Sequence, residues 1–414
     1  MTNSTDSSQR DGLVRKFRTR NIRMVLPFCL FLLFALYLFR YTGGRYVYIP
    51  FPPAELASYF YLLGFVIAGI IIAYPKIRQA RLTVYLSGLC IFLLSYTAIT
   101  MVWAPDTTYS LMKTYYISIE LTIIYLLSVL LFPRNKQRVK LFYLAIFAFV
   151  FTVCLELLYE YVIFGRLTSP HFTRYYITIN RILGVAIPIS VFTWFKYKDY
   201  RVRIFSVVFP TLLLFFIFQT GGRGPLIAAF ISTVVYVGWV LIHKRKMISI
   251  SPSFGIMTIC VTLTSIVTLR MLSDHLDTLN RLQRLFVEGP GGSLLARIQM
   301  ARESIRLFVD SPLFGHGIGS FQTLSASGQY TYPHNIFLEF LVESGSIGLI
   351  MFSAYILSIY LVIIWYGRDN PVYSGLILSV FTFALLNALV SGDIPSNRRL
   401  FVYSATAFSL IEID

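Results

Sequence analysis

Apolar residues occur in long runs along almost the whole chain, and short polar stretches separate these runs. A helix needs about 20 consecutive, mainly apolar residues to cross a membrane, and roughly a dozen runs approach that length. Their approximate bounds are 24–39, 57–74, 82–102, 111–132, 141–164, 182–195, 204–220, 225–243, 254–272, 346–366, 372–390 and 399–412. The pattern therefore predicts an all-α, polytopic membrane protein with about twelve transmembrane helices, in which residues 1–414 form a single integral membrane domain.

The composition agrees with this prediction. Only 13% of the residues are charged and 56% are hydrophobic, whereas about 25% of the residues in a soluble domain are charged. The four cysteines all lie in apolar runs, so they indicate neither a disulfide framework nor a thiolate metal site. The net charge of +17 could suggest a nucleic-acid partner, but in a membrane protein it more often reflects topology and anionic lipid. We therefore expect membrane lipids around the chain and no nucleic acid.

Basic residues are concentrated in alternate gaps between the runs, and this predicts the orientation in the membrane. Residues 1–23 form a polar, then basic arm, and no small-residue cleavage site follows the run at 24–39. We interpret that run as an uncleaved first helix and not as a signal peptide. The other basic clusters lie at 76–81, 134–140, 196–203 and 244–246 and at Arg368. These gaps and both termini are expected on the cytoplasmic side, although the last run is short and interrupted by small polar residues.

The remaining basic residues fall on the outer side, and all of them except Lys113 are arginine. Positive residues there oppose the topological bias, so they need a local reason. Arginine is suited to planar, bidentate recognition of phosphate or carboxylate oxygens. The alternative is that about half of these arginines only anchor helix ends at lipid headgroups. That alternative applies chiefly to Arg40, Arg45, Arg398 and Arg399.

The longest segment outside the predicted spans is an outer loop at 273–333. Apolar residues recur at helical intervals in its first part, 274–292, and again in its second part, 293–312. We therefore predict two amphipathic helices lying over the mouth of the helix bundle.

A polar group stands where this loop meets the next apolar run. Asn335 is expected to cap the helix that follows His334, and a neutral imidazole there can accept a proton from a sugar hydroxyl near neutral pH. Glu339 and Glu343 are four residues apart and share one helix face. Either His334 or Glu339 can be the base, because burial can raise the pKa of a glutamate into the useful range. The alternative is an ordinary interfacial helix start with a capping asparagine and solvated acids.

A second candidate is the segment 220–225, which joins two predicted spans on the outer side. Gly222 and Gly224 allow the backbone to approach a ligand closely, and Arg223 supplies a fixed positive charge at a depth where an unpartnered cation is expensive. The other outer arginines that we expect to bind an anion are Arg297, Arg174 and Arg181.

The segment 315–319 reads Gly-His-Gly-Ile-Gly. It resembles a phosphate-binding loop only loosely, because no strand precedes it and it lies outside the cytoplasm, where ATP is scarce. We interpret it as a turn between the second loop helix and His334, with His316 as an alternative ligand or base. The chain has no HExxH, paired-cysteine, P-loop, GxSxG or DxD motif. An enzyme of this sequence is therefore expected to use no metal and no other cofactor, and to stabilise an anionic leaving group with arginines.

The stretch HNIFLEFLVESGSIG at 334–348 follows the pattern His-Asn, nine residues, Gly, two residues, Gly. This pattern resembles the O-antigen polymerase and O-antigen ligase superfamily. The preceding SPLFGHGIGSF, the upstream TGGRGP, the number of spans and the position of the large outer loop are similar to that superfamily as well. The likeness covers residues 205–366 well and the rest of the chain in general plan.

The resemblance implies a metal-independent, GT-C-like glycosyltransferase at the periplasmic face of the bacterial inner membrane. Its donor would be a glycan on undecaprenyl diphosphate, and its acceptor another lipid-linked repeat or lipid A-core; a chain-length regulator is a further implied partner. By motif, Arg223 and Arg297 would bind the diphosphate and His334 would activate the acceptor hydroxyl. The transfer would invert the anomeric configuration.

Ligase motifs usually continue with Gly-Thr at the second glycine, whereas this chain has Gly348-Leu349. The difference favours a polymerase over a ligase. A transporter or flippase for an anionic lipid or sugar is the alternative from another class. Internal repeats and helices broken at mid-membrane are typical of transporters, whereas here the polar candidates gather at one face.

Overall fold

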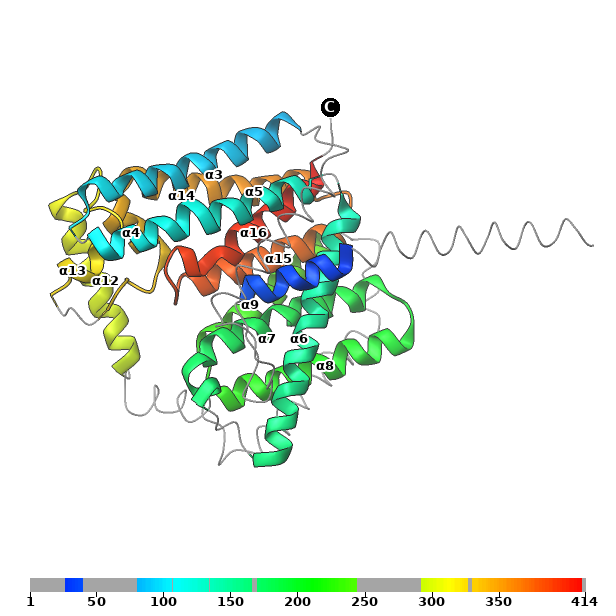
Figure 1. The fold of residues 1–414 in the computed structure, drawn as a ribbon. Coiled ribbons are helices and arrows are strands. Elements are labelled where there is room, and N and C mark those ends of the chain that lie inside the picture. The colour runs from blue at the N-terminus through cyan, green and yellow to red at the C-terminus, as the bar shows by residue number, and fades with distance from the viewer. Residues whose placement is uncertain are drawn as a thin grey trace, which may run out of the picture.

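The computed structural model describes residues 27–39, 80–105, 107–133, 135–165, 170–243, 292–326 and 330–411. Every regular element in these residues is a helix (Figure 1). The predicted runs at 57–74 and 254–272, the arm 1–23 and the first loop helix lie outside the described residues. The same holds for Arg40 and Arg45.

The helices labelled in Figure 1 make up most of the described residues. They are α3 (Arg81–Ile99), α4 (Thr107–Tyr115), α5 (Thr122–Leu131), α6 (Lys136–Phe164), α7 (Pro170–Lys196), α8 (Tyr200–Thr220), α9 (Arg223–His243), α12 (Gly292–Asp310), α13 (Ser320–Leu324), α14 (Ile336–Tyr366), α15 (Pro371–Ala388) and α16 (Arg398–Ala407). A π-helical stretch, Tyr116–Leu121, joins α4 to α5 without interruption.

Eight helical segments of the described residues are long and apolar enough to cross a membrane. They are Arg81–Trp103, Thr108–Leu131, Lys136–Phe164, Tyr176–Lys196, Tyr200–Thr220, Arg223–His243, Ile336–Tyr366 and Pro371–Ala388. Each overlaps one of the predicted apolar runs. This confirms a multi-pass helical membrane protein, while the total of about twelve spans and the GT-C-like arrangement stay predictions.

Two helices begin directly after an asparagine or aspartate residue that caps them. Such side chains accept hydrogen bonds from N–H groups that the first turn of a helix leaves unpaired. Asn135 accepts the N–H of Arg138 at 2.9 Å at the start of α6. Asp199 accepts the N–H of Arg201 at 2.9 Å at the start of α8. At the other end of α6, Gly165 takes the left-handed conformation (φ 67°) that commonly ends a helix.

Helix α15 lies inside the bundle and packs against α7, α9 and α16. Of its membrane-length window, 83% is buried within the protein, so it has little surface to offer to lipid. The indole Nε1 of Trp239 in α9 donates to Ser374 Oγ in α15 at 2.9 Å. Gly375 leaves room for the rings of Trp239 and Tyr236 against the same helix. Close approach through small residues, with a polar bond across the interface, is typical of helix packing in membranes.

The predicted last run at 399–412 forms a short, buried helix, α16, followed by one 3₁₀ turn. Ten residues of α-helix extend about 15 Å, which is half the thickness of a bilayer core. The small polar residues that interrupt the run bind other helices. Ser404 shares a hydrogen bond with Tyr355 of α14, and Thr406 shares one with Tyr143 of α6 at 3.0 Å.

At one end of the bundle, α12 packs across α14, with α13 beside it (Figure 1). Met300 and Leu307 of α12 form a small buried cluster with Phe321 of α13 and Val342 of α14. The prediction of an amphipathic helix over 293–312 is therefore confirmed.

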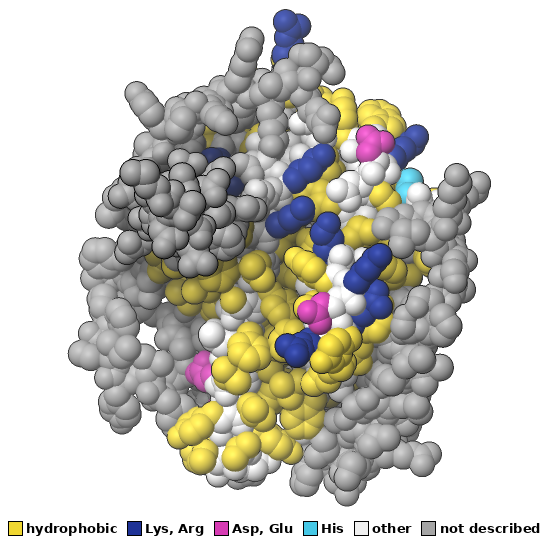
Figure 2. All heavy atoms as spheres, turned by 90° about the vertical axis from the view of Figure 1, so that its right-hand side faces the viewer, with side chains coloured by type: hydrophobic (Ala, Val, Ile, Leu, Met, Phe, Trp, Pro, Cys, Tyr) yellow, Lys and Arg dark blue, Asp and Glu magenta, His cyan; other side chains and the backbone are white. Residues whose placement is uncertain are grey.

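The other end of the bundle carries many lysine and arginine side chains, as Figure 2 shows. Lys136 and Lys140 at the start of α6 and Lys196 at the end of α7 are close enough for their charges to interact. The basic clusters at 134–140 and 196–203 thus share one end, as the predicted orientation requires. Which side of a membrane that end faces stays a prediction.

Candidate active site

The glycine-rich segment after α12 lies against a break in α14. The break is at Gly345, whose φ of 65° and ψ of −164° are non-helical. The N–H groups of His316 and Gly317 donate to two carbonyl oxygens of α14 just before the break, at 2.8 and 3.0 Å. A Cβ atom on Gly315 would overlap the backbone around Gly345. Because these N–H groups are already paired with α14, the segment is a structural turn and not a nucleotide-binding loop.

His316 connects this turn to α12. Its Nε2 atom lies 2.7 Å from the carbonyl oxygen of Leu307, and the side chain is half-buried. A ring held in this way links two structural elements, so the arrangement gives no support to His316 as a ligand or base.

Lys113 of α4 lies between Glu339 and Glu343 of α14. Its Nζ atom is 2.6 Å from Oε1 of Glu339 and 2.5 Å from Oε1 of Glu343. The lysine side chain is 2% exposed and both glutamates are fully buried. The prediction that the two glutamates share a face agrees with this geometry, and the alternative that they are solvated acids is wrong. A cation between them offsets the cost of burying two carboxylates.

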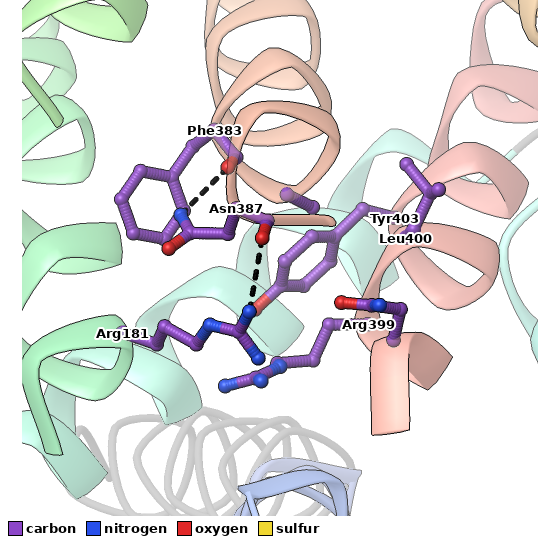
Figure 3. A pocket seen from close by; sticks show the side chains of 8 residues that line it. Arg181, Phe383, Asn387, Arg399, Leu400 and Tyr403 are labelled. Carbon is purple, nitrogen blue, oxygen red and sulfur yellow. Dashed lines mark hydrogen bonds between the residues drawn. The ribbon is translucent and has the colours of Figure 1, made fainter. Parts of the chain in front are cut away.

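Two ionic side chains fix the connection between α15 and α16. From α14, Glu339 Oε1 accepts the N–H of Ile394 at 3.1 Å. From α7, Arg181 Nη2 donates to the carbonyl oxygens of Asn387 at 2.9 Å (Figure 3) and Ser391 at 2.6 Å. The guanidinium group of Arg181 is therefore held in one orientation, close to the place where α16 begins.

His334 lies two residues before the start of α14. Its φ of 56° is the only positive φ at a non-glycine residue in the described part of the chain. Such a conformation costs about 1–2 kcal/mol and is found where the surrounding structure imposes it, often at functional sites. Asn335 caps α14 as predicted, since its Oδ1 accepts two N–H groups of the first turn at 2.9 and 3.3 Å. The imidazole packs on the ring of Tyr332, with centroids 4.5 Å apart.

The surroundings of His334 lower its pKa below the ordinary value of 6.5. Burial is the largest cause, the positive charges of Arg297 and Arg181 follow, and Asp393 acts in the opposite direction. The imidazole is therefore neutral at pH 7, and its free nitrogen can accept a proton. Burial also raises the pKa of Tyr332 to about 12, so that this neighbouring hydroxyl keeps its proton.

Arg223 is the first residue of α9, directly after a glycine-rich turn. Thr220 Oγ1 donates to Asn180 Oδ1 at 2.7 Å, and a Cβ atom on Gly222 would overlap the Asn180 side chain. The turn thus packs on α7, next to Arg181, and the missing side chain at Gly222 permits this packing. A helix N-terminus that carries an arginine is a favourable place for an anion.

The other predicted arginines have different surroundings. Arg297 is exposed on α12 and acts electrostatically on His334. Arg174 belongs to α7, but its side chain is outside the described part. The expectation that Arg398 and Arg399 anchor a helix end at headgroups is wrong. Arg398 is 6% exposed and lies 3.6 Å from Glu120, while Nη1 of Arg399 is enclosed within the protein.

The structure thus brings His334 together with Arg297 and Arg181, and it adds Lys113 and Asp393, which sequence reasoning did not select. Lys113 had one visible signal, since it is the only lysine among the outer basic residues. Its glutamate partners are 226 and 230 positions away, so spacing along the chain could not identify them.

These residues belong to a multi-pass helical membrane protein in which a neutral histidine lies within electrostatic reach of two arginines. The same helix carries the two glutamates of a buried lysine–glutamate cluster. Residues 209–353 match the family model described as O-antigen ligase. This match supports the resemblance to the O-antigen polymerase and ligase superfamily. The matched range contains Arg223, Arg297 and His334, whereas Lys113 and Arg181 lie outside it. No curated protein matches the chain.

Proposed function

We propose that this protein is an O-antigen polymerase-like glycosyltransferase. It moves a glycan from undecaprenyl diphosphate onto a lipid-linked acceptor sugar at the periplasmic face of the bacterial inner membrane. The observation that carries the proposal is the half-buried imidazole of His334, whose pKa is lowered by burial and by Arg297 and Arg181. A neutral base beside fixed cations suits a reaction in which a hydroxyl loses a proton and a diphosphate leaves.

In the proposed reaction, the acceptor hydroxyl gives its proton to the free nitrogen of His334 while its oxygen attacks the anomeric carbon of the donor. The bond between that carbon and the diphosphate oxygen breaks, and the lipid diphosphate leaves with the electron pair. Arg223 and Arg297, with Arg181 and Arg174, stabilise the negative charge that develops on the leaving group. Attack from the face opposite to the leaving group inverts the anomeric configuration. Because arginines supply the positive charge, no step requires a metal ion.

In this proposal, Glu339 is a positioning residue and His334 is the base. The Glu339 carboxylate is fully buried, and one oxygen binds both Lys113 and the backbone of Ile394. A carboxylate with these partners is poorly placed to meet a sugar hydroxyl. Through these bonds Glu339 holds the start of α14 against the segment between α15 and α16, which includes Asp393. The position of His334, just before α14, is fixed in the same way.

An O-antigen ligase, which would transfer the glycan to lipid A-core in lipopolysaccharide assembly, is the second candidate. The description of the matching family favours it, whereas the Gly348-Leu349 sequence favours the polymerase. The two enzymes differ only in the acceptor, so the same His334 and arginine chemistry serves both.

The residue assignments can be tested by complementation of a deletion strain. Arg223→Ala, Arg297→Ala and His334→Ala are each expected to abolish glycan transfer while the protein remains folded in the membrane. Arg302→Ala is the matched control, because Arg302 is also exposed on α12 but is not among the charges that lower the pKa of His334. Full activity in all three variants would contradict the proposal.

The lipopolysaccharide of the deletion strain distinguishes the two acceptors. A core capped with a single repeat indicates a lost polymerase. Naked core together with accumulated lipid-linked polymer indicates a lost ligase and would overturn the polymerase proposal. Normal lipopolysaccharide would contradict both.

A further inference from the structure

One side of α12 is apolar and exposed. Leu294, Ile298, Ile305 and Val309 follow one another at intervals of four, seven and four residues, which places them on the same side of the helix. Each of these side chains is at least 40% exposed, and Val309 is 69% exposed. The side of α12 that packs against α13 and α14 is a different one. These four residues, the apolar face of α12, are therefore left uncovered by the protein.

A third side of the same helix is polar. Gln299, Glu303, Arg306 and Asp310 recur at intervals of four, three and four residues. Arg306 forms ion pairs with Glu303 at 2.7 Å and with Asp310 at 3.5 Å. The helix thus has one side packed on protein, one polar side and one apolar side. Separate polar and apolar sides on an exposed helix are typical of helices that lie in a membrane interface.

The apolar face continues beyond the end of α12. Leu313 and Phe314 follow in the turn after the helix, and more than half of each side chain is exposed. The Phe314 ring lies 6.5 Å from the ring of Trp103, edge to face. Trp103 ends a segment of membrane-spanning length, and its neighbour Val102 is 84% exposed, as expected of a span that faces lipid. The apolar face is therefore continuous with a lipid-facing surface, at a tryptophan of the kind that marks a membrane boundary.

The length of α14 places the same turn at the edge of the hydrocarbon core. The helix has 31 residues, or about 46 Å at 1.5 Å per residue, whereas the core is about 30 Å thick. Trp365 is exposed at the end of α14, where an aromatic side chain is typical of one boundary. About 20 residues of helix reach the other boundary, which therefore falls close to Gly345. The N–H of Ser346 donates to the carbonyl oxygen of Pro312 at 2.8 Å, so the turn after α12 lies at this level.

We infer that the apolar face of α12, together with Leu313 and Phe314, is seated in the membrane leaflet at this end of the bundle, between the lipid headgroups and the acyl chains. Figure 1 shows α12 running across the axes of α3 and α14, so the helix follows the plane of the membrane. Both of these spans place the end of α12 at the boundary of the core. The partner of this surface is therefore lipid, and burial of the apolar side chains among acyl chains stabilises the contact.

The lipid contact has a consequence for the candidate active site, because α12 also carries Arg297, whose charge acts on His334. A helix seated in the leaflet holds this arginine at a fixed height above the hydrocarbon core. The seat itself does not depend on glycosyl transfer.

Nitroxide accessibility measures the position of the apolar face directly. Labels are attached to Ile298→Cys, Ile305→Cys and Val309→Cys in the full-length protein, with the native cysteines replaced by alanine, in vesicles of phosphatidylethanolamine and phosphatidylglycerol. The matched controls are Gln299→Cys and Asp310→Cys, which are exposed on the polar side and adjoin two of the labelled positions in the chain. Oxygen concentrates in lipid and a nickel chelate stays in water, so the ratio of oxygen to nickel collisions is expected to be several-fold higher on the apolar face.

Equal ratios on the two sides would overturn the inference, because the apolar face would then lie in water. Labels on the apolar face that are shielded from both reagents would overturn it as well, because another segment of the chain or a second copy would then cover this face.

A charge placed in the apolar face tests whether lipid holds α12 in position. Ile305→Asp is expected to raise the nickel accessibility of a label at Val309→Cys about twofold or more, because a carboxylate in hydrocarbon is costly. Gln299→Asp, on the polar side, is expected to leave it unchanged. Both side chains are exposed, so neither variant disturbs the packing of the core. The same response to both charges would overturn the inference. No glycan is present, so the outcome is independent of the proposed function.

Discussion

Replacing His334 with glycine is expected to abolish glycan transfer and to leave the protein more stable than the His334→Ala variant. The two replacements remove the same imidazole. They differ in the backbone, because His334 has a φ of 56° and the other positive φ values in the described residues belong to glycines. Glycine adopts this conformation without steric cost, whereas alanine does not.

The size of the stability difference between the two variants follows from this difference in the backbone. Both variants lose the contact between the imidazole and the Tyr332 ring, at 4.5 Å between centroids, which contributes about 0.5–1.5 kcal/mol. The alanine variant also keeps the left-handed backbone, at a cost of about 1–2 kcal/mol relative to glycine. Because glycine loses about 0.5–1 kcal/mol more conformational entropy on folding, the net advantage of the glycine variant is about 1 kcal/mol.

The assay compares the wild-type protein and the two variants in the same detergent, by thermal unfolding and by transfer from a lipid-linked glycan. An advantage of about 1 kcal/mol corresponds to a Tm difference of about 2 °C in a chain of this size. Transfer by the glycine variant at the wild-type rate would refute the role of the imidazole. A glycine variant less stable than the alanine variant would refute the backbone argument.

The remaining predictions concern other parts of the site. The pH profile of kcat/KM is expected to have an acid limb with its midpoint below 6.5, because His334 is active when neutral and its pKa is lowered. Asp393→Asn removes a charge that raises this pKa, so the midpoint should move to lower pH; an upward shift would contradict the assignment. Lys113→Met leaves two fully buried carboxylates without their cation and is expected to cost about 3–5 kcal/mol of unfolding free energy; an unchanged Tm would show that the cluster is unimportant for stability. Gly345→Ala places a Cβ atom against the carbonyl oxygen of Leu313, in a backbone conformation that only glycine adopts readily. The expected cost is about 2–3 kcal/mol of unfolding free energy. Yield and Tm equal to those of the wild type would contradict the packing of the glycine-rich turn against the break in α14.

The sequence predicted the elements that depend on local pattern. The eight membrane-length helices follow from apolar runs, and the Asn335 cap follows from its position before an apolar helix. The second loop helix follows from apolar residues at helical intervals. In each case the information is contained within about 20 neighbouring residues, which is the length over which hydrophobic periodicity acts.

The parts that the sequence did not predict depend on contacts between distant segments. The spacing of four residues predicted that Glu339 and Glu343 share one helix face. Only the packing of α4 on α14 brings Lys113 between them. Arg399 resembled a headgroup anchor because it begins a weak apolar run, whereas burial of α16 directs it toward Arg181. The sequence also did not reveal the break in α14 at Gly345. The N–H groups that bind the carbonyl oxygens just before it, those of His316 and Gly317, lie 26 positions earlier in the chain.

The polymerase assignment can be tested by incubating the purified protein with lipid-linked repeat units alone, in the absence of lipid A-core and with a chelator present. The proposed function predicts lengthened lipid-linked glycan and one free undecaprenyl diphosphate for each new glycosidic bond, and neither product with His334→Gly. If the wild-type protein leaves the repeats unchanged, the protein is not a polymerase of this kind; if the variant lengthens them equally well, His334 is not the base.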